Sequence, residues 1–481
     1  MSIDGLERTR AIIADATRNM KSNYQGISLV EAGVSALHLS NFDIDEMNRE
    51  FAFIVIGKGE MIVWFRPGAR QEEGVRLITM SAFRALSHNA RHQWVDDKGK
   101  ERSISYADKW LMHPGRRDFA GIEFFPNPDG AEGKHGYLNL WTGFTVQPRP
   151  GGSYSVFRDH LRTNVCDGDE TLFRWLFAWF AQLVQQPRQK TGTAIVLRGG
   201  MGYGKTVVGE VIGSLFSNHY VLADDPRYLT GNFNAHMASC LLLQADEAIW
   251  AGDKGSEGRL KGLVTSTTQM IEGKGIDPIK IDNFLRIIMT SNNDWVVPAG
   301  KDERRFAIFD VAGHAAQNHT YFGEMAEELD SGGRGALLRD LLDFDLSSVN
   351  VRVIPKTAAL LEQKVHSLEP IDAWLLDRLH AGTPTKHHSK WPDFITASAL
   401  RDDYLGAADK VGVHRKSFET QFGTRFQKLM PRARKARRNV SVSDESGPER
   451  LWGYDLPPLS MARDDFEAEF GQSIRWDRSD E

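Results

Sequence analysis

The strongest chemical signal in the sequence is the segment Gly199-Gly-Met-Gly-Tyr-Gly-Lys-Thr206, which fits the pattern Gly-x4-Gly-Lys-Thr. It stands between an apolar strand expected at 194–197 and a helical pattern at 207–216. Glycines allow backbone N–H groups to surround phosphates at the start of a helix. Lys205 would reach the β and γ phosphates of ATP, and Thr206 would bind Mg²⁺. The predicted nucleotide contacts are Gly199, Gly200, Met201, Gly202, Tyr203, Gly204, Lys205 and Thr206.

Two acids follow a second apolar run, Cys240-Leu-Leu-Leu-Gln-Ala. Nucleotide hydrolysis needs one carboxylate that positions the metal and another that activates water, both at a strand end near the phosphates. We expect Asp246 to hold Mg²⁺, usually through water, and Glu247 to polarise the attacking water. An acid pair in this position is also typical of a solvated helix start, so the interpretation depends on the phosphate loop that precedes it.

A third apolar run, 284–291, ends at Asn292, whose amide could contact the γ-phosphate and orient the water. Shortly after it, Arg304 and Arg305 fall on an expected exposed turn. There an arginine could reach the γ-phosphate of a neighbouring subunit, although an ordinary surface arginine is the alternative. Of the two, Arg305 is the first choice and Arg304 the second.

The segment Ile271-Glu-Gly-Lys274-Gly-Ile-Asp-Pro278 places one lysine between two glycines. Such a segment is typical of a hairpin tip that displays a single positive charge. Lys274 could grip a DNA phosphate, or the segment could be an ordinary surface hairpin.

Length and composition exclude several classes of protein. The chain has 481 residues, 41% hydrophobic and 26% charged residues, 18 prolines and a net charge of −5. These values are typical of a folded protein of two or three domains, and any nucleic-acid site must be a local basic cluster. The only cysteines, Cys166 and Cys240, cannot build a disulfide framework or a four-cysteine zinc site.

The sequence also indicates a compartment. The charged start of the chain does not resemble a signal peptide, and no apolar run approaches the roughly 20 residues that span a bilayer. We therefore expect a cytoplasmic protein with no membrane partner.

Periodicity divides the chain into four regions. Residues 1–100 are expected to form an α+β region of uncertain role, and 101–190 a loop-rich and helical segment that leads into an α/β domain at 191–345. In the first region, His88 and His92 fall on an expected helix at 80–94, but no third metal ligand accompanies them. The α/β domain contains three buried runs that favour a parallel sheet.

Residues 365–481 change to helices and turns, and the run from Lys428 to Arg438 contains six basic residues and no acid. The region resembles a winged-helix domain, with 415–422 as the expected recognition helix. A solvated helical face is the alternative. The expected DNA contacts within this run are Arg432, Arg434, Arg437 and Arg438.

The order of phosphate loop, acid pair, lysine hairpin, strand-end asparagine and arginine resembles superfamily III helicases of viruses, phages and plasmids. More narrowly, the chain is similar to the helicase region of phage-type primase-polymerases over roughly residues 105–310. The phrases that carry this second likeness lie at 110–114, 137–141, 231–234, 246–247 and 297–306.

The resemblance implies an AAA+-like P-loop NTPase core and a homo-hexameric ring that hydrolyses ATP at its subunit interfaces. It also implies 3′ to 5′ movement on single-stranded or forked DNA, driven through Lys274. By motif it assigns Lys205, Thr206, Asp246, Glu247, Asn292 and the arginines the roles given above.

The sequence departs from longer members of that family at its start. Only Asp43 and Asp45 resemble part of a polymerase or primase acid set, and they also read as a polar turn. His387 and His388 do not form a nicking motif. A separate primase or polymerase would therefore have to supply priming.

Two other classes remain open at this point. An AAA+ replication initiator or loader would bind DNA without unwinding it. A small-molecule kinase shares the phosphate loop but needs neither the arginine nor the hairpin lysine.

Overall fold

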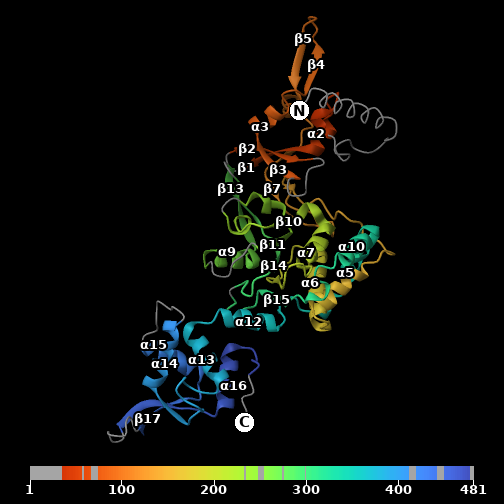
Figure 1. Ribbon diagram of the computed structural model, residues 1–481. Coiled ribbons are helices and arrows are strands. Elements are labelled where there is room, and N and C mark those ends of the chain that lie inside the picture. Colours follow the sequence, from red (N-terminus) through yellow and green to blue (C-terminus); the bar gives the residue numbers. More distant parts are fainter. Residues whose placement is uncertain are drawn as a thin grey trace, which may run out of the picture.

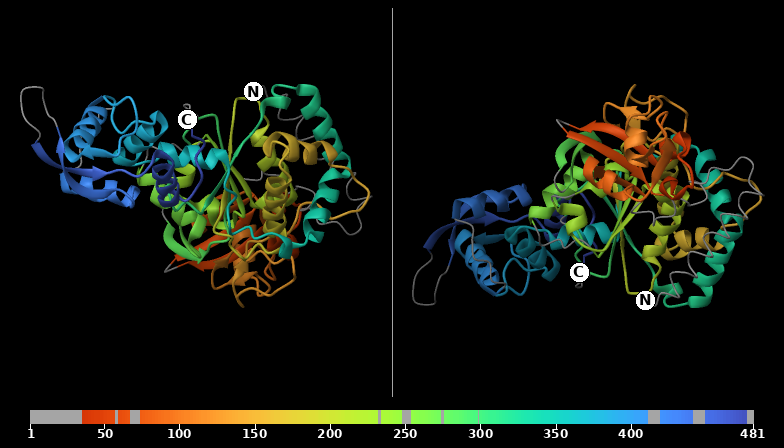
Figure 2. Two further views of the ribbon diagram at one scale, coloured as in Figure 1. Left: turned by 90° about the horizontal axis from the view of Figure 1, so that it is seen from below. Right: turned by 90° about the horizontal axis from the view of Figure 1, so that it is seen from above.

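The computed structural model describes residues 35–56, 59–66, 74–231, 234–247, 254–273, 276–297, 299–410, 419–440 and 449–476. Three parts follow one another along the molecule, with the N-terminal sheet at one end, a parallel sheet in the middle and a helical part with a small sheet at the other end (Figures 1 and 2). In this described part of the chain, no helix is long and apolar enough to span a bilayer.

The N-terminal part is a sheet in the order β3-β2-β1-β6, with helices on it and a separate β4–β5 hairpin that projects from it (Figure 1). The buried side chains Phe51, Phe83 and Trp110 form its core. Its elements are η1 (Ala36–His38), α2 (Ile44–Glu50), β1 (Phe51–Ile56), β2 (Gly59–Phe65), β3 (Val75–Thr79), α3 (Met80–Leu86), β4 (Arg91–Val95), β5 (Glu101–Ser105), α4 (Tyr106–Leu111) and β6 (Asp118–Phe119).

The helix expected over 80–94 is wrong in its second half. The helix α3 ends at Leu86, and His92 lies on strand β4, paired with Ile104 of β5. His88 and His92 therefore do not share a helix face. No group of three possible metal ligands occurs among the residues that the structure describes.

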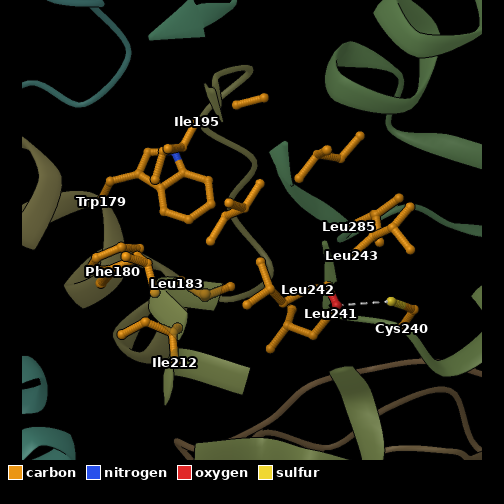
Figure 3. Close-up of a cluster of buried hydrophobic side chains, with 14 of the residues drawn as sticks. Trp179, Phe180, Leu183, Ile195, Ile212, Cys240, Leu241, Leu242, Leu243 and Leu285 are labelled. Atoms are coloured by element: carbon orange, nitrogen blue, oxygen red, sulfur yellow. Dashed lines mark hydrogen bonds between the residues drawn. The ribbon is translucent and has the colours of Figure 1, made fainter. Parts of the chain in front are cut away.

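A connecting segment of short elements leads to the long helix α6 (Glu170–Gln185), which Asp169 caps by accepting hydrogen bonds from two backbone N–H groups. Figure 3 shows Trp179 and Leu183 of this helix gathered with side chains of the central sheet. The earlier elements are β7 (Ile122–Glu123), β8 (Leu138–Asn139), α5 (Ser155–Asp159) and the π-helix η3 (His160–Val165).

The central sheet has five strands, all parallel, in the order β10-β11-β14-β9-β15. The strands are β9 (Ala194–Arg198), β10 (Tyr220–Ala223), β11 (Leu242–Asp246), β14 (Arg286–Ser291) and β15 (Phe306–Asp310). Strands β9 and β14 are buried throughout, which explains the apolar runs 194–197 and 287–289 that they contain. Because β14 lies between β9 and β11, three chain segments meet at one edge of the sheet.

Helices cover this sheet, and a hairpin extends from it. The helical elements are α7 (Lys205–Gly213), η4 (Ser214–His219), α8 (Arg227–Thr230), η5 (Ala235–Ser239), α9 (Lys254–Thr265), η6 (Gly313–Ala315), α10 (His319–Glu328), η7 (Leu329–Gly333), α11 (Arg334–Asp343), η8 (Leu346–Ser348) and α12 (Ala358–His366). The hairpin pairs β12 (Thr268–Gly273) with β13 (Ile276–Asp282) in antiparallel fashion. Lys274, the expected DNA contact, lies outside the described residues.

The C-terminal part has its own core around Trp374, Tyr404 and Phe426. In chain order it contains α13 (Pro370–Ala381), β16 (Phe394–Thr396), α14 (Ala397–Lys410), α15 (Glu419–Leu429), β17 (Arg434–Val440), β18 (Glu449–Asp455) and α16 (Leu459–Phe470). Its sheet has the order β16-β18-β17. Residues 415–418 of the expected recognition segment lie outside the described residues, and residues 419–422 begin α15; the basic run continues from α15 onto strand β17.

His219, the last residue of η4, holds the segment before α6 against the central part of the molecule through its contacts with Trp141 and Thr142. Its ring stacks on Trp141, with 4.5 Å between ring centroids. Its Nε2 accepts a hydrogen bond from the backbone N–H of Thr142 (2.9 Å), so its Nδ1 carries the proton and donates to the carbonyl of Ser239 (2.8 Å). Burial lowers the pKa of His219 from 6.5 to about 4. The native contacts therefore require the neutral imidazole.

We expect acid to destabilise the protein through His219. Between about pH 6.5 and pH 4, the unfolded chain binds a proton at this residue and the folded chain does not, so the free energy of unfolding falls by up to about 1.4 kcal/mol per pH unit. Urea unfolding of the wild type and of His219→Gln, which keeps a donor and an acceptor but does not titrate, measures this effect. Equal pH slopes for the two proteins would contradict it.

Candidate nucleotide-binding site

The loop between β9 and α7 adopts a conformation that requires glycine. Gly202 and Gly204 have positive φ angles of 77° and 82°. A Cβ atom at Gly204 would also lie 2.6 Å from Cε1 of His160 and 2.8 Å from Cε1 of Phe322. The loop is therefore held close to the π-helix and to α10, and it delivers the chain to the first residue of α7.

Lys205 is buried at the start of α7 and its amine points back to the loop. It donates hydrogen bonds to the carbonyl oxygens of Gly199 (2.8 Å) and Gly200 (2.7 Å) and to Oδ1 of Asn292 (2.7 Å). Burial lowers the pKa of Lys205, while the negative charges of Asp246 and Glu247 act against that shift. The amine is thus fixed inside the loop, where the sequence analysis expects a phosphate.

Asp246, the last residue of β11, lies beside Thr206. Its Oδ2 accepts a hydrogen bond from the Thr206 hydroxyl (3.3 Å), and its Oδ1 accepts one from the hydroxyl of Thr290 on β14. A hydroxyl and a carboxylate oxygen are ligands that Mg²⁺ prefers, and this ion takes its other ligands from water and phosphates. The chemistry of these donors fits Mg²⁺ between Thr206 and Asp246.

Glu247 and Asn292 are joined across the sheet edge. The side-chain amide of Asn292 donates to Oε1 of Glu247, while its oxygen accepts from Lys205. Glu247 has a φ of 52°, which is uncommon for a residue with a side chain and is characteristic of functional positions. Its backbone N–H bonds the carbonyl of Thr290 (3.0 Å). One amide therefore links the phosphate-loop amine to the acid expected to act as base.

Several supporting residues were missed by the sequence analysis. His160 contacts the carbonyl of Gly204 through Nε2 (3.2 Å), and Gln244 donates to the carbonyl of Thr206 (3.0 Å). Thr290 could have been found from the sequence, because side chains alternate along a strand and Thr290 and Asn292 are two residues apart. His160 had no such signal, since it comes from a π-helix far from the loop in the chain.

Arg304 and Arg305 lie at the opposite edge of the sheet. They precede β15, where Phe306 pairs with Ala194 at the beginning of β9, whereas the phosphate loop follows the end of β9. A strand of this length separates the two edges by about 15 Å. Arg304 is exposed, while the Arg305 side chain is only 25% exposed and has Nη1 3.9 Å from a Glu303 carboxylate oxygen. Neither can contact a nucleotide held by the loop of the same chain.

The four arginines expected to bind DNA differ in their surroundings. Arg432 lies 3.2 Å from Asp465 and Arg438 lies 2.7 Å from Asp455, so both have acidic partners. Arg434 is exposed on β17. Arg437 donates to the carbonyl of Arg450 (3.0 Å) and lies 5.8 Å from the ring of Trp452 on β18. Arg434 lies opposite Asp455 in the pairing of β17 with β18, but neither Arg434 nor Arg437 forms an ion pair with a carboxylate among the described residues.

The segment that holds the site matches a known protein family. Residues 197–305 match a family of unknown function, DUF5906. This segment begins at the end of β9 and ends at Arg305, so it contains the phosphate loop, both acids, Asn292 and the two arginines. It does not contain the C-terminal part.

The chain is similar in sequence to the DNA primase-polymerase of Nitratiruptor phage NrS-1, at 25% identity over 289 residues. The match spans 56% of this chain but only 40% of the relative. Its fold is similar to two apo structures of the NrS-1 C-terminal region, at 17% and 16% identity, each with a TM-score of 0.59. Each comparison covers 85% of this chain, and 97% and 98% of the respective region.

We expect Asn292→Asp to lower the rate of ATP hydrolysis by at least about 100-fold, because the new carboxylate cannot donate to Glu247 and places a second negative charge beside it. Asn293→Asp makes the same charge change one residue away and is the matched control. The measurement is phosphate release at saturating ATP and Mg²⁺. Equal rates for the two variants would contradict the role given to Asn292.

Proposed function

We propose that this protein is an ATP-driven DNA helicase or translocase that works in DNA replication. The observation that carries the proposal is the hydrogen-bonded series Lys205, Asn292 and Glu247 beside the pair Thr206 and Asp246, all at the carboxyl edge of one parallel sheet. Phosphate groups, a metal and an activated water need these side chains together.

Each side chain has a separate task in this proposal. Lys205, now bonded to two loop carbonyls, exchanges them for phosphate oxygens as the nucleotide enters. Glu247 accepts a proton from the attacking water. Asn292 joins both groups, so it senses whether a γ-phosphate occupies the space beside Lys205. Mg²⁺ bound by Thr206 and Asp246 would neutralise phosphate charge.

The two arginines favour an assembly with several copies of the chain. Because Arg304 and Arg305 lie at the amino edge of the sheet, an arginine from one copy could complete the site at the carboxyl edge of the next. A homo-hexameric ring, proposed from the family resemblance, would repeat this contact. Arg304 is the more exposed of the two and now becomes the first choice for this role.

The C-terminal part supplies a surface for DNA. Its order of helix, strand, two helices and β hairpin supports a winged-helix domain, and β17 carries the exposed residues Arg434, Lys435 and Arg437. Trp452, which is 55% exposed, lies 5.6 Å from the Lys435 amine. An aromatic ring beside cations suits stacking on a base together with phosphate contact.

The similarity to a phage DNA primase-polymerase supports a role in replication. The relatedness in fold is to the C-terminal region of that protein, so we place priming in a separate primase or polymerase with which this chain would work. A loader that binds DNA without unwinding it is the competing function, and the outcome on forked DNA distinguishes the two.

Strand displacement on a forked DNA tests the proposed function directly. We expect the wild type with ATP and Mg²⁺ to release the labelled strand, and Lys205→Ala to release none because it cannot clamp the phosphates. ATP hydrolysis that is stimulated by single-stranded DNA without any displacement would indicate the loader instead. Hydrolysis that is insensitive to DNA would contradict both.

Mixing two inactive variants tests whether Arg304 or Arg305 acts in the site of a neighbouring subunit. In a ring of Lys205→Ala and Arg304→Ala subunits at equal amounts, about a quarter of the interfaces keep both groups, so we expect a similar fraction of wild-type turnover to return. The same mixture with Arg305→Ala shows which arginine acts. No recovery in either mixture would show that neither arginine acts across subunits.

The salt dependence of DNA binding tests the surface of β17. Replacing Arg434, Lys435 and Arg437 with alanine should weaken binding and reduce the slope of log K against log salt by about one unit for each removed cation that binds a phosphate. The control is Arg432→Ala with Arg438→Ala, which removes cations that already face Asp465 and Asp455. An unchanged slope in the triple variant would overturn the assignment.

A further inference from the structure

A cavity of about 310 Å³ opens beside the phosphate loop, between the start of α7 and α10. One wall consists of residues 202–207, and the other is formed by Gln317, His319 and Phe322. Its volume is at the lower end of the range for small-molecule pockets. Residues 202–206 line the cavity and are also among the predicted phosphate contacts. The cavity therefore continues directly from the position expected for the phosphates.

The inner wall is apolar and held in place. The Phe322 ring lies against Gly204 and meets the His160 ring edge to face, with 5.8 Å between ring centroids. Burial lowers the pKa of His160, which favours the neutral imidazole beside Phe322. Val207 adds a further apolar side chain from α7. Among the described residues no carboxylate lines this cavity, and the side chains of Phe322 and Val207 suit a flat, uncharged ring.

A backbone hydrogen bond joins the two walls of the cavity. The backbone N–H of Gln317 donates to the carbonyl of Gly202 (3.2 Å). Asn318 then caps α10 by accepting from the N–H of Tyr321 (3.1 Å). Gln317 is exposed, which leaves its side-chain amide at the mouth of the cavity with one donor and one acceptor group.

We propose that this cavity takes the purine base of the nucleotide whose phosphates are held at Lys205. Phe322 stacks on the base, and the Gln317 amide meets the polar edge of the base. The inference rests on the proposed function. It adds the residues that recognise the base and so distinguish a nucleotide from a polyphosphate without a base. A purine fits better than a pyrimidine because its larger face covers more of the Phe322 ring.

Calorimetric titration with two ligands tests the cavity without depending on catalysis. ATP has the base and tripolyphosphate lacks it, and both are titrated with Mg²⁺ into the full chain. We expect Phe322→Leu and Phe322→Ala to weaken ATP binding by about tenfold, within the range for removing one aromatic ring that stacks on a base, and to leave tripolyphosphate binding unchanged. Tyr321→Phe, which removes only a hydroxyl bonded to the carbonyl of Val156, is the control and should bind both ligands normally.

Phe322→Leu keeps an apolar side chain against Gly204, so it separates base recognition from support of the loop. Unchanged ATP affinity in both Phe322 variants would overturn the proposal, as would an equal loss of ATP and tripolyphosphate binding in Phe322→Leu. If the wild type binds neither ligand, the nucleotide site itself fails. If it binds both with equal affinity, the nucleotide site stands and the base pocket fails.

Discussion

Parallel pairing of β14 between β9 and β11 is the constraint on which the candidate site depends. It places the ends of three strands at one edge of the sheet, where Lys205, Asn292 and Glu247 form a continuous hydrogen-bonded series. The amide of Asn292 has one donor side and one acceptor side, so it can join an amine to a carboxylate that do not touch. The geometry of the sheet, rather than proximity along the chain, thus creates the arrangement.

The same sheet also keeps two groups of residues apart, one at each of its edges. Its carboxyl edge carries Lys205, Asn292 and Glu247, and its amino edge carries Arg304 and Arg305, so these two groups of residues cannot meet within one copy of the chain. Close packing requires glycine at position 204, because His160 and Phe322 leave no space there for a side chain. The contacts of His160 and Phe322 beneath Gly204 therefore fix the position of the loop relative to the π-helix and α10.

Local patterns in the sequence predicted β9, β11 and β14 and the loop that follows β9, but not the two outer strands β10 and β15 of the same sheet. Patterns failed where the decisive partner is distant in the chain: His160 supports the loop from a π-helix, and Phe322 reaches it from α10. The strand β4 was mistaken for the end of a helix over 80–94, because its pairing with β5 leaves no signal in the periodicity of that segment. The acidic partners of Arg432 and Arg438 depend on tertiary packing, so composition alone treated all the arginines of the basic run as equivalent.

The central claim is that this sheet edge binds ATP and activates water through Glu247. The most direct measurement follows ATP binding and phosphate release on the same samples of wild type and Glu247→Gln. The account predicts equal ATP affinity and a rate of release that is lower by about 100-fold or more in Glu247→Gln, because the amide cannot accept a proton. Phosphate release by Glu247→Gln at the wild-type rate would contradict this claim.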